Sequence, residues 1–275
     1  MAGLWIPEDT ARVLRKPTAA DDKYSRGVLG VRTGSAQYPG AAVLGVEAAW
    51  RTGLGMVRYL GAARDLVLQR RPETVTVDGR VQAWLIGSGT DAATRPAAET
   101  SALRDLLAGD LPVVVDAGAL GLAVGATARR IVTPHDREHE RLRQELGLAP
   151  SGGDRVQAAR ETAAALGAVI VLKGARTVVA DPHGWATAVE SGTAWLATAG
   201  TGDVLAGAVG ALVAGAAADD PAIDAHGLAR VAASAAWLHG RAGALASAAR
   251  GGGPITALDV AEALPRAVAE ALAIA

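Results

Sequence analysis

The segment from Ala194 to Ala216 constrains the fold of this chain more than any other. A short apolar run leads into the turn Gly200–Asp203, and a stretch that is apolar on nearly every side follows. A helix that is hydrophobic all round has to be buried. Its first N–H groups then lack partners inside the protein, and an anion such as a phosphate suits them. We therefore expect a core helix over 204–217 that begins at an anion site.

Asp203 needs a separate explanation, because a carboxylate repels a phosphate. It is either an ordinary N-cap behind a glycine turn or a base that takes a proton from a hydroxyl as that hydroxyl attacks phosphorus. The four-residue motif alone favours the cap, whereas the buried helix behind it favours the base. We predict that Asp203 is catalytic.

The composition fits a soluble enzyme with a large core. The 275 residues are 50% hydrophobic and 20% charged, which suits one α/β domain spanning 1–275. A net charge of −1 gives no reason to expect nucleic acid or an anionic membrane as a partner. No cysteine is present, which excludes disulfides and thiolate chemistry. The N-terminus does not resemble a signal peptide, and the apolar stretch after Asp203 has no basic flanks, so we expect a cytoplasmic protein.

Strands rich in Val and Leu alternate with helical patterns, which predicts βαβ units and a mainly parallel sheet. We expect strands over 27–33, 56–60, 81–86, 112–115 and 130–133, and helices over 41–51, 97–107, 138–146 and 154–166. Four short strands, 168–173, 177–180, 185–190 and 194–197, then form a β-meander that leads into the buried helix. Helices over 204–217, 225–249 and 256–272 complete the chain, the last behind a capping box at Thr256 and Asp259.

Several candidate groups follow predicted strands, where open α/β sheets bind ligands. They are the loop 34–40, Gly87 with Gly89, Asp116, His135 and the turn 200–203. The usual nucleotide-binding fingerprints are absent. No Asp, Glu or His cluster has the spacing of a metal site, so we assign no metal ligand. Any Mg²⁺ would be carried by nucleotide phosphates and water.

Two of these strand-end residues have competing interpretations. Lys173 alone is more often a solvated lysine, but with Gly174 and Thr177 it offers a nucleotide a charge, a close backbone approach and a hydroxyl. His135 follows a proline and is more often a loop residue. Its place at a strand end makes it a candidate hydrogen-bond donor to substrate.

A set of motifs in fixed order resembles the NAD(P)H-hydrate dehydratases, ribokinase-like enzymes that repair hydrated NADH and NADPH. The resemblance runs from about Lys23 to the last helix. The motifs are Lys23-Tyr-Ser-Arg-Gly27, Gly34-Ser35 with Tyr38-Pro-Gly-Ala-Ala42, Val114-Val-Asp-Ala117, Thr133-Pro-His135 with Glu138, Leu172-Lys-Gly-Ala-Arg-Thr177, and Gly200-Thr-Gly-Asp-Val-Leu-Ala-Gly207. This chain departs from the family pattern at Gly87-Ser-Gly-Thr-Asp91, at Gly118 and at Arg137.

The resemblance implies a ribokinase-like three-layer α/β/α fold and a lyase that uses ADP, or ATP, with Mg²⁺. It implies that the ring hydroxyl of the hydrated cofactor is phosphorylated and lost as phosphate, ADP giving AMP. It assigns nucleotide binding to Lys173, Gly174, Ala175, Arg176, Thr177, Gly200, Thr201 and Gly202. It assigns contacts with the hydrated cofactor to Ala41, Gly89, His135 and Asp203. It also implies a homo-oligomer, a tetramer in the family, and a separate epimerase acting on the same substrate.

Two other functions remain open at this point. One is a vitamin or sugar kinase on the same fold, which would release its phosphorylated product. The other is a non-catalytic nucleotide-binding sensor. The segments 173–177 and 133–135 favour the dehydratase over the kinase. The intact turn Gly200–Asp203 argues against a sensor, because a pure binder has no use for a carboxylate near phosphate.

Overall fold

The computed structural model describes residues 2–274 and places their strands in one sheet. The strand order is β1-β9-β8-β7-β6-β5-β4-β2-β3. All neighbouring strands are parallel except at β8, which is antiparallel to both β7 and β9. The mainly parallel sheet and the β-meander are therefore confirmed. The strands are β1 (Gly3–Leu4), β2 (Val28–Arg32), β3 (Met56–Tyr59), β4 (Ala83–Ile86), β5 (Val113–Val115), β6 (Arg130–Val132), β7 (Val169–Leu172), β8 (Thr177–Ala180) and β9 (Ala186–Val189).

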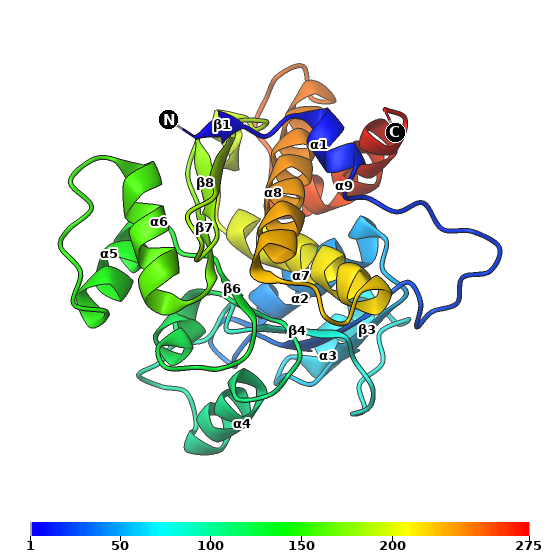
Figure 1. The fold of residues 1–275 in the computed structure, drawn as a ribbon. Helices are drawn as coiled ribbons and strands as arrows, with labels where there is room; N and C mark the ends of the chain where they lie inside the picture. The colour runs from blue at the N-terminus through cyan, green and yellow to red at the C-terminus, as the bar shows by residue number, and fades with distance from the viewer. Residues whose placement is uncertain (1, 275) are drawn as a thin grey trace.

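Helices cover both faces of the sheet, which makes three layers (Figure 1). Successive strand residues point to opposite faces, so Leu29 and Val31 join one core cluster while Val28 joins the other. The first cluster contains residues of α2 (Pro39–Thr52), α3 (Arg64–Arg70), α7 (Thr201–Asp219), α8 (Ala225–Ala248) and α9 (Ala257–Leu272). The second contains residues of α4 (Ala97–Leu107), α5 (Asp136–Glu145), α6 (Arg155–Leu166) and the 3₁₀ helix η1 (Ala117–Ala123).

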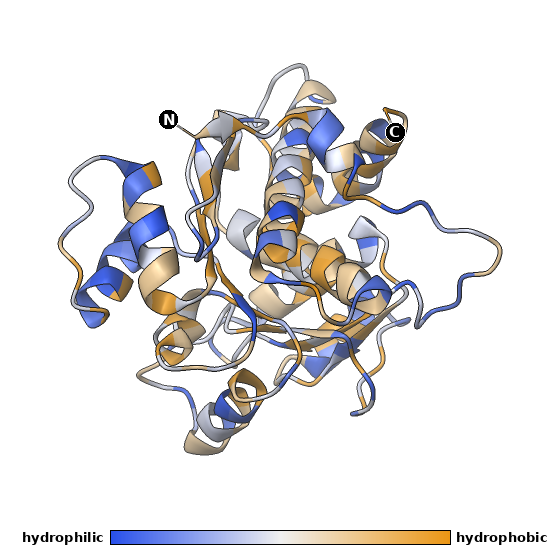
Figure 2. Cartoon of the chain, in the orientation of Figure 1, coloured by the Kyte–Doolittle hydropathy of each residue, from blue (hydrophilic) through white to orange (hydrophobic). Residues whose placement is uncertain are grey.

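Helix α7 is buried, as its sequence predicts. Val204, Val209 and Val213 are fully buried, and the helix packs between α2 and α8 over the sheet. By length and composition it could cross a membrane, but 67% of its apolar window is buried inside the protein. Figure 2 shows the contrast between the apolar α7 and the hydrophilic α5. The apolar character of α7 is therefore that of a core helix.

A close contact between two glycines brings α2 and α7 together. A Cβ added to Gly207 would lie 2.2 Å from the backbone oxygen of Gly45, so no larger residue fits there. Because the two helices touch along this line, the N-terminus of α2 is held near the N-terminus of α7. The packing thus brings the loop after β2 to the turn that precedes α7.

The strand expected over 194–197 is wrong. Ala194–Leu196 form a 3₁₀ helix, η2, whose first turn is capped by the hydroxyl of Thr193. The chain turns here from β9 into α7. Sequence periodicity also missed β1, the short helix α1 (Pro7–Ala11) and α3. Elements of two to seven residues are too short to show a period.

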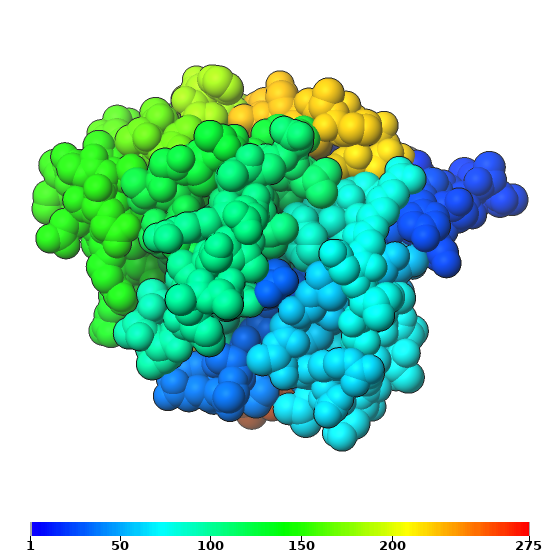
Figure 3. All heavy atoms as spheres, turned by 90° about the horizontal axis from the view of Figure 1, so that it is seen from below, coloured from blue at the N-terminus to red at the C-terminus, as the bar shows by residue number. Residues whose placement is uncertain are grey.

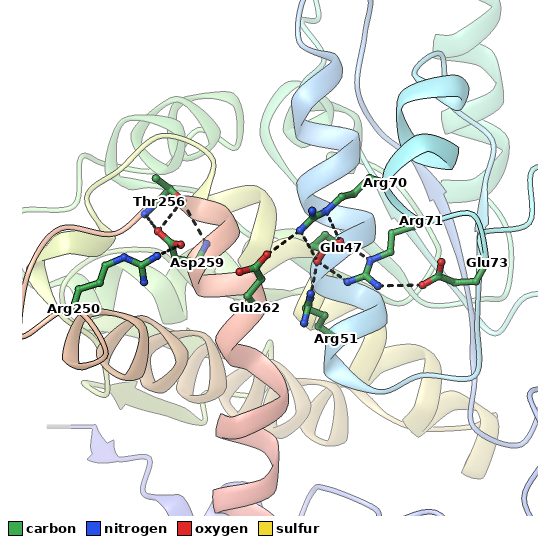
Figure 4. Close-up of polar contacts among 9 residues, drawn as sticks. All are labelled: Glu47, Arg51, Arg70, Arg71, Glu73, Arg250, Thr256, Asp259 and Glu262. Atoms are coloured by element: carbon green, nitrogen blue, oxygen red, sulfur yellow. Dashed lines mark hydrogen bonds and ion pairs between the residues drawn. The ribbon is translucent and has the colours of Figure 1, made fainter.

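A buried ion cluster ties three helices together (Figure 4). Glu47 of α2 is fully buried and accepts hydrogen bonds from Arg51, Arg70 and Arg71. Arg70, at the end of α3, also donates to Glu262 of α9 at 3.0 Å. The cluster therefore fixes α2, whose first turn contributes to the site described below.

The segment between α1 and β2 extends away from the body of the molecule. It is the dark-blue segment at one side in Figures 1 and 3. Arg15 pairs with Asp21 within this segment and with Asp219 at the end of α7. The segment is thus held at its base to the core helix.

Candidate active site

Groups that follow five strands meet at one edge of the sheet, as the parallel topology requires. The loop after β4 touches the first turn of α2, since a Cβ on Gly89 would lie 2.4 Å from the Cβ of Ala41. Gly89 has φ +64°, a left-handed conformation that glycine adopts without strain. Two residues expected to contact the hydrated cofactor, Ala41 and Gly89, are therefore adjacent.

Asp116, directly after β5, forms the centre of the polar groups. It is 2% exposed and accepts hydrogen bonds from Ser88 Oγ at 2.9 Å and Thr133 Oγ1 at 2.7 Å. Lys173 Nζ, at the end of β7, lies 2.9 Å from Asp116 Oδ1. These donors follow the ends of β4, β6 and β7, so the sheet fixes the position of this carboxylate.

Lys173 connects two acidic groups. Its ammonium also lies 3.8 Å from Glu138 Oε2 on α5. Burial opposes the charged form, but the carboxylates of Asp116 and Glu138 outweigh it and raise the pKa of Lys173. Lys173 therefore remains a fixed positive charge at this edge of the sheet.

Asp203 is not an N-cap. The N-cap of α7 is Gly200, with φ +88° and no side-chain cap, and Asp203 occupies the third helical position. Within residues 2–274 its carboxylate has no hydrogen-bond partner, so it is free to meet a ligand. Burial, with the nearby charge of Asp116, raises the pKa of Asp203 to about 7, while Lys173 opposes the shift. A carboxylate with such a pKa is suited to accept a proton near neutral pH.

The start of α7 also offers unused hydrogen-bond donors. Among the described residues, the backbone N–H groups of Gly202 and Asp203 have no acceptor. A Cβ on Gly202 would lie 3.8 Å from Lys173 Nζ, so the helix terminus and the ammonium face the same space. Free amides, a helix dipole and a lysine together make a site for an anion.

A cavity of about 360 Å³ opens at this terminus and is lined by both polar and apolar residues. Six of the eight residues expected to bind nucleotide line it: Lys173, Gly174, Ala175, Thr177, Thr201 and Gly202. The apolar wall is formed by residues of β9, η2, α7 and α8, namely Val189, Leu196, Leu205 and Ala236. A lining that combines an ammonium, free amides and apolar side chains suits a ligand with a charged part and an apolar part.

The other two expected nucleotide residues lie outside this lining. Arg176 is largely exposed and pairs with Glu190 at 2.9 Å. Gly200, at the start of the turn, faces α2, since an added Cβ would lie 2.5 Å from Leu44 Cδ1. Sequence reasoning also missed residues that do line the cavity: Ser191, Gly192, Thr193, His239 and Gly240.

A second hollow, of about 420 Å³, lies near Lys173. It is formed by the loops after β2, β4 and β5 and by α5, with lining residues that include Tyr38, Thr90, Gly118 and Glu138. Glu138 lines this hollow and approaches Lys173, which lines the first cavity. The two hollows therefore approach each other at the Lys173–Glu138 pair.

His135 is the N-cap of α5. Its Nδ1 accepts hydrogen bonds from the backbone N–H groups of Arg137 and Glu138, and its own backbone N–H donates to Glu138 Oε2. Because Nδ1 accepts, the proton of the neutral ring is on Nε2. The side chain is 49% exposed, so Nε2 can still donate to a ligand. A contact between His135 and substrate remains a prediction.

The sheet and its flanking helices form a ribokinase-like α/β fold. The chain belongs to the NAD(P)H-hydrate dehydratase family, whose model matches residues 29–266. The structure is similar to the ADP/ATP-dependent NAD(P)H-hydrate dehydratase of Bacillus subtilis co-crystallised with ATP/Mg²⁺. That match has a TM-score of 0.83 and 27% identity, and it covers 98% of this chain and 99% of the other.

Two curated relatives agree with this family. The bifunctional NAD(P)H-hydrate repair enzyme of Mycobacterium leprae is 43% identical over 90% of this chain and 51% of its own length. The ADP-dependent (S)-NAD(P)H-hydrate dehydratase of Neisseria meningitidis is 38% identical over 78% of this chain and 76% of its own length. This chain spans about half the length of the bifunctional relatives that it matches.

Proposed function

We propose that this chain catalyses the nucleotide-dependent dehydration of hydrated NADH and NADPH, which restores the reduced cofactors. The observation that carries the proposal is the arrangement at the start of α7. An unpartnered carboxylate, Asp203, with a pKa of about 7 lies beside free backbone amides and the ammonium of Lys173. A base next to an anion site is what the phosphorylation of a hydroxyl requires.

The first step makes a leaving group. The hydrated ring carries a hydroxyl on the carbon next to the ring nitrogen, and hydroxide leaves poorly. Asp203 takes the hydroxyl proton as the oxygen attacks the terminal phosphorus of ADP, so that the hydroxyl becomes a phosphate ester and AMP leaves. The amides of Gly202 and Asp203 stabilise charge on the moving phosphoryl group, and each such donor contributes roughly 3–4 kcal/mol in well-studied sites.

The second step completes the dehydration. The lone pair of the ring nitrogen expels phosphate, and loss of a proton from the neighbouring carbon restores the dihydronicotinamide. We propose that the substrate occupies the second hollow, between the loops after β4 and β5, with Ala41, Gly89 and His135 at its edge. The adenine nucleotide would then fill the first cavity, with the reacting groups meeting at Lys173 and Asp203.

Mg²⁺ fits this site only as a companion of the nucleotide. Among residues 2–274, no group of three acidic or histidine side chains is placed to hold a metal ion. The ion would therefore be carried by phosphate oxygens and water, where it neutralises phosphate charge. We further propose one catalytic domain, a cytoplasmic location and a homo-oligomer, with a separate epimerase acting on the same substrate.

One assay tests the proposal against the related kinase activity. Purified protein is incubated with hydrated NADPH and ADP, and in parallel with ATP. The expected result is recovery of absorbance at the NADPH band in step with the release of phosphate and AMP. A stable phosphorylated product without that absorbance would instead show a kinase, and nucleotide binding without turnover would show a sensor.

A further inference from the structure

The second hollow is lined by one basic side chain and three acidic ones. Among the lining residues that the structure describes, Arg141 of α5 carries the only positive charge, whereas Asp91, Glu138 and Glu145 carry carboxylates. Arg141 is exposed, so a ligand in the hollow can reach its guanidinium. Because carboxylates repel anions, an anionic group that enters this hollow is directed to Arg141.

The guanidinium of Arg141 is not used by the protein itself. Residues three and four apart on a helix are neighbours, so Glu138 and Glu145 are placed to pair with Arg141. Within residues 2–274 neither forms an ion pair with it, and its side chain makes no hydrogen bond. Glu138 instead approaches Lys173 and accepts a hydrogen bond from the His135 N–H. The N–H donors of Arg141 are therefore free, and their fork suits two oxygens of a phosphate.

The position of Arg141 along α5 selects the part of the substrate that it meets. The helix begins after His135, and Glu138 in its first turn lies 3.8 Å from the ammonium of Lys173. Arg141 is three residues further on, about 4.5 Å along the helix axis. In a hydrated dinucleotide the ring is joined through a ribose to a pyrophosphate, and a 2′-phosphate lies at the far, adenosine end. With the reacting ring near Lys173, the pyrophosphate is the first anionic group along the substrate.

We propose that Arg141 binds the pyrophosphate of the hydrated dinucleotide and thereby anchors the substrate in the second hollow. The inference rests on the proposed function, because it takes the second hollow as the substrate site. Arg141 binds the substrate in this account and takes no part in the transfer of protons or of the phosphoryl group.

Titrations without any adenine nucleotide test the inference, because no turnover occurs. Hydrated NADH, hydrated NADPH and the hydrated form of reduced nicotinamide riboside, which lacks phosphate, are titrated into the unaltered protein and into Arg141→Ala. Calorimetry measures the affinities, with ligand NMR where binding is weak. Arg141→Ala should bind both hydrated dinucleotides about 10–100-fold more weakly, the effect of losing hydrogen bonds from a charged group. It should bind the riboside as well as the unaltered protein does.

Two further variants serve as controls. Arg141→Lys keeps the charge but loses the planar fork, so its affinities for the dinucleotides should be intermediate. Arg137→Ala removes an exposed arginine of the same helix that does not line the hollow, and it should bind all three ligands normally. Because the side chain of Arg141 makes no contact that holds the fold, Arg141→Ala should keep its melting temperature and its affinity for ADP.

The outcomes separate this inference from the proposed function. Unchanged affinity of Arg141→Ala for hydrated NADH overturns the inference and leaves the proposed function intact. A loss confined to hydrated NADPH also overturns it, because the contact would then be to the 2′-phosphate. An equal loss in Arg137→Ala overturns it as well, since it would show general attraction by positive charge. No binding of either hydrated dinucleotide by the unaltered protein would overturn the proposed function itself.

Discussion

Lys173 Nζ lies 2.9 Å from Asp116 Oδ1, although the two residues are 57 positions apart in the chain. They meet because β6 lies between β5 and β7 in the sheet, and each residue follows the last residue of its strand. The pair lies where the two hollows approach each other. Asp116 thus holds the ammonium of Lys173 in place, and in the proposed function that ammonium meets a nucleotide phosphate.

Lys173→Ala should act mainly on the nucleotide. Loss of the ammonium should raise the concentration that gives half-maximal rate, and it should do so more for ADP than for hydrated NADPH. It should also raise the pKa of Asp203, because Lys173 stabilises that carboxylate. Steady-state kinetics check this, with the exposed Lys16→Ala as control. A larger change in the hydrated-NADPH concentration for half-maximal rate would show that Lys173 serves the hydrated cofactor and not the nucleotide.

Asp203→Asn should make the protein more stable at high pH. The unfolded carboxyl ionises above 3.8, while the folded one stays protonated until about 7. The stability of the folded state that depends on this carboxyl is therefore fully present below pH 3.8 and is lost as the pH rises to about 7. The loss in the free energy of unfolding reaches about 4 kcal/mol. Urea unfolding should show the variant to be more stable at pH 8 and equal to the original near pH 3. An equal difference at both pH values would contradict the raised pKa.

Two variants of His135 separate its capping from its binding role. His135→Ala loses the N-cap and should destabilise the protein by about 1 kcal/mol. His135→Asn can still cap α5 but lacks the Nε2 donor. Both should bind the hydrated cofactor about 1–3 kcal/mol more weakly, with ADP binding unchanged. If His135→Asn restores stability and cofactor affinity together, His135 is only a cap.

Glu47→Gln should strongly destabilise the fold. Burial opposes ionisation of Glu47, but hydrogen bonds from Arg71, Arg51 and Arg70 lower its pKa to about 2. The resulting stability is present above the unfolded value of 4.5 and is lost as pH falls through about 2. Breaking such a buried cluster costs about 3–5 kcal/mol at pH 7, measured by urea unfolding.

Glu73→Gln is the matched control for this cluster. Glu73 pairs with Arg71 at 3.2 Å, but its side chain is 43% exposed. An exposed pair of this kind contributes about 0–1 kcal/mol. Equal losses of stability in the two variants would show that burial of Glu47 is not the source of the effect.

The sequence predicted those parts of the fold that depend on local pattern. The apolar surround of 204–217 indicated a core helix, and Thr256 with Asp259 forms the expected capping box. The 194–197 segment was assigned wrongly, because four apolar or small residues look alike in a strand and in a 3₁₀ turn. Only the Thr193 cap distinguishes them.

The site was predictable only where motif residues follow strands. Asp116 and Lys173 were identified in this way, but their pairing depends on the strand order. His239 lies within an alanine-rich apolar helix, and nothing local sets it apart from a core residue. Its place in the cavity comes from the packing of α8 on α7, which no sequence period encodes.

The rate of hydrated-NADPH turnover as a function of pH, compared between the unaltered protein and Asp203→Asn, tests the central claim most directly. With ADP saturating, the unaltered protein should lose rate as pH falls through about 7, or somewhat higher because bound phosphates add negative charge. Asp203→Asn should bind ADP normally, react about 10²–10⁴-fold more slowly and lack that dependence. Near-normal turnover in Asp203→Asn, or the same fall in rate with pH, would contradict the role of Asp203 as the base.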